Sequence, residues 1–95
     1  MQTSEVLSAN DQNTAAPTLR LVPNPTTTAV WLSLSTPPEQ GRITVFDPAG
    51  RLLHSLEWPA GAEQARVDVS DFPRGWYVVQ VQTNQGVATQ KLVRQ

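Results

Sequence analysis

The chain has 95 residues, seven basic and eight acidic side chains, a formal net charge of −1 and no cysteine. This length allows one domain, and a domain of this size buries only about 60–65% of its unfolded surface. The absence of cysteine excludes disulfides and thiol chemistry, and the scattered basic residues argue against a nucleic-acid partner.

Residues 1–18 are small and polar, and apart from Met1 only Val6 and Leu7 are large and apolar. Such a segment buries too little apolar surface to offset its ordering entropy, so we predict a flexible linker. A short helix over residues 5–10 is the alternative. The start of the chain also lacks the basic and apolar regions of a secretory signal peptide. If the protein is exported, we expect that signal elsewhere in a longer precursor.

From residue 19 onward, short apolar runs of β type alternate with turn residues. Pro23 and Pro25 lack a donor N–H, which restricts the first run to a sheet edge or a strand entry. Alternation predicts that Val, Leu, Ile and Tyr side chains point inward in the later runs. The predicted strands cover residues 19–22, 28–34, 42–46, 51–58, 64–69, 76–82 and 87–93.

Proline and glycine mark the connections between these runs. Asp47-Pro48-Ala49-Gly50 has the residue order of a type I turn, and residues 72–75 have Pro second and Gly fourth in the same way. Residues 83–86 form a third predicted turn. About seven short antiparallel strands without a helix predict an all-β fold, an immunoglobulin-like β-sandwich. Residues 19–95 form this domain.

Three tryptophans do not fit the inward pattern simply. Alternation puts Trp31 and Trp76 on the faces opposite the Val, Leu and Tyr set. Either the sandwich has a second covered face, or these indoles are partly exposed. Exposed aromatic side chains are enriched at protein interfaces, and they also form platforms on which sugars stack.

The candidate chemical residues have simpler structural explanations. Asp47 and Asp68 lie beside turns or strand ends, where aspartate bonds backbone N–H groups. His54 is the only histidine, and no nucleophile motif or His/Cys cluster accompanies it. We therefore predict that the domain is not an enzyme and needs no metal or cofactor.

Several motifs together resemble one known family. They are, in chain order, Pro23-Asn24-Pro25, residues 43–51, residues 67–70, residues 72–79 and Lys91-Leu92-Val93. Arg94 and Gln95 extend beyond the terminal Lys-Leu-Val motif. With these motifs the chain is similar to the type A C-terminal sorting domain of cargo proteins of the type IX secretion system (the Por system) of Bacteroidetes.

The resemblance implies a non-catalytic secretion signal. Such a domain is fused behind a cargo domain, passes through the periplasm, and targets its cargo to the outer-membrane translocon. A sortase-like peptidase then removes it by cutting upstream, which would place the cut in residues 1–18. The cargo reaches the cell surface or is secreted. The alternatives are a carbohydrate-binding or structural immunoglobulin-like accessory module of a secreted enzyme.

The candidate recognition residues come from the turns and the last strand. Gly50, Gly75 and Gly86 are first of all turn residues, and Arg51 is either a plain surface charge or a recognition residue. In the last strand, Lys91 is expected to face outward while Leu92 packs inward. A terminal strand at a sheet edge would expose unpaired backbone groups, available to a partner or a second copy. The complete candidate set is Gly50, Arg51, Gly75, Gly86, Lys91, Leu92 and Val93.

Overall fold

The computed structural model describes residues 17–95, which form seven β-strands. The all-β prediction is confirmed, and the strand bounds differ from the predicted ones by at most one residue at either end. Residues 1–16 lie outside the described part, so the proposed linker and the alternative short helix stay predictions. The strands are β1 (Leu19–Val22), β2 (Ala29–Leu34), β3 (Gly41–Phe46), β4 (Leu52–Glu57), β5 (Gln64–Asp68), β6 (Gly75–Thr83) and β7 (Gly86–Arg94).

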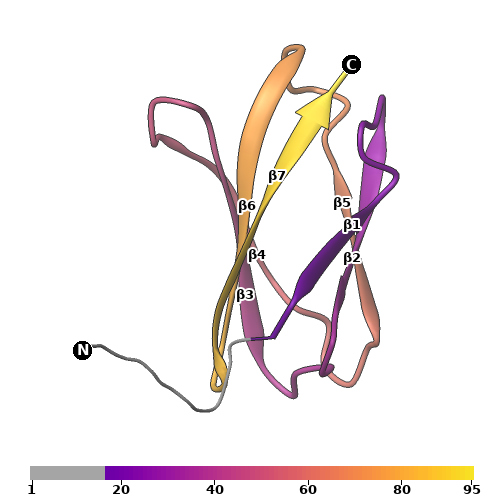
Figure 1. Ribbon diagram of the computed structural model, residues 1–95, viewed down its shortest axis with the longest axis vertical. Coiled ribbons are helices and arrows are strands. Elements are labelled where there is room, and N and C mark those ends of the chain that lie inside the picture. The colour runs from indigo at the N-terminus through magenta and orange to yellow at the C-terminus, as the bar shows by residue number, and fades with distance from the viewer. Residues whose placement is uncertain (1–16) are drawn as a thin grey trace, which may run out of the picture.

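The strands form two antiparallel sheets that face each other (Figure 1). One sheet has three strands in the order β1-β2-β5, and the other has four in the order β4-β3-β6-β7. Tight turns make neighbours of β3 and β4 and of β6 and β7, and β1 and β2 are also neighbours in one sheet. The other three connections cross between the sheets. The sheets pack together because each strand places alternate side chains on the inner face.

The core lies between the sheets and matches the predicted inward set. Along β2, Val30, Leu32 and Leu34 are buried while Trp31 is exposed. Because β1 also contributes buried leucines, this edge strand is a full part of the core. The buried apolar residues are Leu19, Leu21, Val30, Leu32, Leu34, Ile43, Val45, Trp58, Ala65, Val67, Val69, Tyr77, Val79, Val81, Ala88 and Leu92.

Two buried aromatic side chains satisfy their polar groups within the chain. The Trp58 indole Nε1 donates to the carbonyl of Ala62 over 2.9 Å. The Tyr77 hydroxyl donates to the carbonyl of Pro73, four residues upstream, as in the tyrosine corner of immunoglobulin-type sandwiches. Trp58 is therefore a core residue, whereas Trp31 and Trp76 are partly exposed, the second of the predicted alternatives.

The turn predicted at residues 72–75 lies earlier in the chain. The hydrogen bond that closes it runs from the N–H of Phe72 to the carbonyl of Val69 over 3.0 Å. The prolyl ring of Pro73 removes a donor, and Pro73 instead offers its carbonyl to Tyr77. At the other boundary, Pro17 is buried and the N–H of Thr18 donates to Ser35 Oγ over 2.9 Å. These two residues, assigned to the linker from sequence, pack with the domain.

Candidate recognition surface

Most of the candidate recognition residues gather at one end of the sandwich. We call this the C-terminal end; it holds the turn at residues 47–51, the turn at residues 69–72 and the last residues of β7 (Figure 1). Gly86 is an exception, because it pairs with Thr83 at the opposite end of the β6–β7 hairpin, whereas Gly75 pairs with Arg94. Leu92 is fully buried, so it supports the strand and presents no surface.

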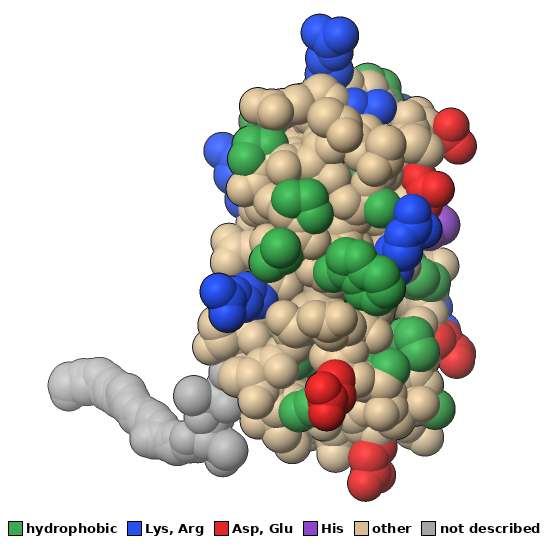
Figure 2. Space-filling view, turned by 90° about the vertical axis from the view of Figure 1, so that its right-hand side faces the viewer, with side chains coloured by type: hydrophobic (Ala, Val, Ile, Leu, Met, Phe, Trp, Pro, Cys, Tyr) green, Lys and Arg blue, Asp and Glu red, His purple; other side chains and the backbone are tan. Residues whose placement is uncertain are grey.

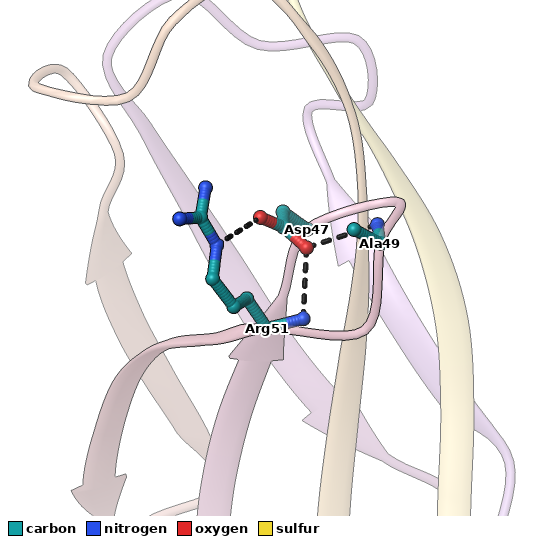
Figure 3. A network of polar contacts seen from close by, with 3 residues as sticks. All are labelled: Asp47, Ala49 and Arg51. Atoms are coloured by element: carbon teal, nitrogen blue, oxygen red, sulfur yellow. Dashed lines mark hydrogen bonds and ion pairs between the residues drawn. The ribbon is translucent and has the colours of Figure 1, made fainter.

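The turn at residues 47–51 is built around the carboxylate of Asp47 (Figure 3). Asp47 Oδ1 accepts hydrogen bonds from the N–H of Ala49 over 2.9 Å and of Arg51 over 2.8 Å. Its Oδ2 pairs with Arg51 Nε at 3.0 Å. The turn also needs Gly50, whose φ of +87° favours glycine although a Cβ there would meet no other atom. Arg51 is therefore ordered at its base, while its side chain stays 80% exposed.

These contacts predict a pH dependence for the turn. The backbone hydrogen bond from Arg51 is the main reason that the pKa of Asp47 lies below its usual 3.8. A carboxyl whose pKa is lower in the folded chain stabilises the fold above its unfolded pKa, and this stabilisation is lost as the pH falls through the folded pKa. We expect the melting temperature to fall below about pH 4, and to fall less steeply in Asp47→Asn. Parallel melting-temperature profiles for the two proteins would contradict this.

The last strand places its side chains as predicted. Lys91 and Val93 lie on the outer face of the four-stranded sheet, on either side of the buried Leu92. The Lys91 ammonium lies 5.2 Å from the centre of the Trp76 ring, within the range of a cation–π interaction. The motif thus presents two outward side chains, Val93 and the Lys91 cation beside the indole of Trp76.

The segment between β1 and β2 closes the outer edge of β7, which the sequence analysis did not anticipate. The Asn24 side chain donates to the carbonyl of Lys91 over 2.8 Å and accepts from the N–H of Val93 over 3.0 Å. The N–H of Thr26 donates to the carbonyl of Val93 over 2.9 Å, and its carbonyl accepts from the N–H of Gln95 over 2.8 Å. We call this segment the clasp. The expectation of unpaired backbone groups is therefore wrong for the last residues of the strand.

Arg94 ties the end of β7 to the other sheet. Its Nε donates to the carbonyl of Val69 over 3.1 Å and its Nη2 to that of Ser70 over 3.0 Å. A guanidinium suits this position, since it can reach two carbonyls of the turn after β5 at once. The residues after the Lys-Leu-Val motif are thus part of the fold. The sequence shows Arg94 itself but not its partners, because these lie 24 and 25 residues earlier in the chain.

The other titratable residues show structural contacts. Asp68 Oδ1 accepts hydrogen bonds from the hydroxyl and from the N–H of Ser70, and these, the hydroxyl first, hold the pKa of Asp68 below its usual value. The ring of His54 lies edge-on to the ring of Phe72, with the two ring centres 6.5 Å apart.

Across residues 17–95, no three His, Asp or Glu side chains lie close enough together to hold a metal ion. The described part of the chain contains no helix with the length and apolarity that a membrane crossing requires.

An open hollow of about 950 Å³ lies at the opposite end of the sandwich. Its charged lining includes Glu39 and the ion pair between Arg42 Nη2 and Glu57 Oε2, which are 3.4 Å apart. Among the described residues, its lining includes no histidine, serine or cysteine.

The comparisons with known proteins fit these features. A family model described as the secretion system C-terminal sorting domain matches residues 20–95. The chain belongs to this family. The sorting domain is therefore a module that is fused to a cargo protein and handled by the type IX secretion system, which exports cargo to the cell surface or the medium.

Among solved structures, the sorting domain is similar to a DUF3244 family protein with an immunoglobulin-like β-sandwich fold from Bacteroides vulgatus. The TM-score is 0.61 at 15% identity, over 81% of this chain and 91% of that one. This likeness confirms the predicted fold class and says nothing of function. No curated protein matches the sequence.

Proposed function

We propose that residues 17–95 are a non-catalytic sorting signal that is read, as a folded domain, by the type IX translocon in the outer membrane. The observation that carries this proposal is the match of the family model to nearly all of the sandwich. The charged and polar side chains of the C-terminal end also support it. Their hydrogen bonds stabilise the fold, which is a structural role rather than a catalytic one. These side chains are Asp47, Asp68, Asn24 and Arg94. What this domain offers a partner is its surface.

The finer steps of export follow from the same proposal. An N-terminally fused cargo would cross the periplasm with the domain folded behind it. A sortase-like peptidase would then cut upstream of the domain, in the region of residues 1–18, and leave the cargo on the cell surface or in the medium. Because Pro17 and Thr18 pack with the domain, we place the cut before Pro17.

The proposal predicts that residues 17–95 are sufficient for export. A folded periplasmic reporter fused in front of them should reach the cell surface in a host with the secretion system, and remain in the periplasm in a strain without it. The matched control is the same reporter fused to the DUF3244 family sandwich, which shares the fold at 15% identity. Surface labelling and cell fractionation provide the measurement. Retention of the first fusion in the periplasm, with the reporter folded, would rule the proposal out.

A carbohydrate-binding module is the second candidate, because two indoles are exposed. The Trp76 ring is already approached by Lys91 at 5.2 Å, which leaves less of its face for a sugar ring. Trp31 has no such neighbour among the described aromatic and cation–π contacts. A glycan array separates the two readings, since a sorting signal should bind none of the immobilised sugars.

A further inference from the structure

The outer face of the four-stranded sheet carries apolar side chains on all four strands, with Lys91 among them. Phe46 on β3 pairs with Leu52 on β4 and with Val78 on β6, and Val78 pairs with Lys91 on β7. These positions form one row across all four strands. Trp76 and its partner Val93 extend the row toward the C-terminal end. We call the outward side chains of Leu52, Phe46, Val78, Trp76, Val93 and Lys91 the Trp76 face.

The charge on and around this face is one-sided. Asp47 is paired with Arg51, and Glu57 is paired with Arg42 at 3.4 Å. Lys91 belongs to neither ion pair of the described residues, and its ammonium lies over the indole of Trp76. The face therefore combines apolar side chains with an ammonium that has no carboxylate beside it, which favours a partner that supplies one.

The other surfaces of the sandwich are less suited to docking. On the three-stranded sheet, Trp31 pairs with Val22 and Arg66. Figure 2, which views the side of the molecule that this sheet forms, shows the apolar side chains as separate patches with basic side chains on both flanks. The edge of β7 is closed by the clasp from Lys91 onward. On the four-stranded sheet every strand carries an apolar outward side chain, and the row from Leu52 through Phe46 and Val78 ends at Lys91. Trp76, beside this row, is 42% exposed.

We propose that the Trp76 face is the docking surface of the sorting domain, and that its partner is an apolar protein surface with a carboxylate facing Lys91. This inference rests on the proposed function, since it names the surface through which the export machinery reads the domain. A second copy of the chain fits less well, because two such faces would bring the same uncompensated positive charge together. An anionic glycan fits less well because the Lys91 ammonium lies over the indole.

The two exposed tryptophans give a matched test. In the reporter fusion, Trp76→Ser should lower surface display by about tenfold or more, as buried tryptophan anchors at interfaces do. Trp31→Ser, at 46% exposure on the opposite sheet against 42% for Trp76, should change display by no more than about twofold. Melting temperatures of both variants serve to show that each is folded. Equal loss of display in the two variants, or loss in Trp31→Ser alone, overturns the proposal.

The charge of Lys91 is tested separately, so that the proposal does not depend on the Trp76 variant folding. Lys91→Glu should reduce display by about tenfold, Lys91→Gln should reduce it less, and Lys91→Arg should retain it, because the partner supplies a carboxylate. The matched control is Arg20→Glu, an exposed basic residue on the three-stranded sheet. Display that is unchanged in Lys91→Glu, or equally reduced in Arg20→Glu, contradicts the assignment.

Photocrosslinking identifies the occupant. A benzophenone amino acid at Val78 should give a covalent adduct with a protein of the host outer membrane, and the same group at Ser33, on the outer face of the three-stranded sheet, should not. An adduct of twice the fusion's own mass would mean a second copy, and either that result or a glycan adduct overturns the proposal.

If the parent fusion is exported while every Trp76 and Lys91 variant is also exported, the docking face is wrong and the sorting function stands. If the parent fusion stays in the periplasm, the sorting function itself fails.

Discussion

Removal of residues 91–95 is expected to unfold the sorting domain and thereby to block export. The deletion takes away Leu92 from the core and the pairing of β7 with residues 75–78 of β6. It also removes Arg94 and the backbone groups that the clasp binds. The loss should be comparable with the whole stability of a small domain, about 5–15 kcal/mol.

The measurement is thermal or urea unfolding followed by circular dichroism, together with surface display of the reporter fusion. The truncated domain should already be unfolded at room temperature and should therefore show no cooperative unfolding transition. A cooperative transition within a few degrees of the parent would contradict the role we give the last five residues. Because the deletion unfolds the domain, its loss of export would not locate the contacts with the export machinery. Single substitutions on the Trp76 face are needed for that purpose.

Leu92→Ala is expected to give the largest effect of any single change in the last strand. The Leu92 side chain is 0% exposed, and truncation of a buried leucine leaves a cavity that costs about 2–5 kcal/mol. Leu52→Ala is the matched control, because the same side chain on the same sheet is 56% exposed there. Its cost should stay within about 0.5 kcal/mol.

Urea unfolding of the two variants checks this directly, with the free energy of unfolding extrapolated to water. Equal losses of stability would mean that Leu92 is not the core residue that the structure shows. The comparison also separates two roles of the Lys-Leu-Val motif. Leu92→Ala should lower export only as far as it lowers the folded fraction. Lys91→Glu should lower export of a domain that stays folded.

The sequence by itself predicted the number of strands, the inward set and the immunoglobulin-like fold class. These features are local, because alternation with period two shows which side chains of a strand share a face. Turn chemistry is local as well, and Asp47, Pro48 and Gly50 formed the predicted turn. The turn after β5 was misplaced by three residues, because the pattern of Pro73 and Gly75 did not show that Tyr77 would bind the Pro73 carbonyl.

For the candidate surface, the sequence predicted which side chains point outward but not which distant segments of the chain pair with each other. Alternation along β7 correctly placed Lys91 outward and Leu92 inward. It gave no sign that Asn24 would bind β7, since Asn24 is 67 and 69 residues away in the chain from the two residues that it contacts.

The sequence alone determined that this chain is an all-β sorting domain, because family motifs and strand periodicity are both carried by short segments. Only the tertiary structure decided which of its surfaces are available. The register across β4, β3, β6 and β7 joins Leu52, Phe46, Val78 and Lys91 into one row. The clasp closes an edge that the sequence left open. Both results depend on pairing between distant segments, and such pairing is settled by the packing of the two sheets as a whole rather than by any local pattern.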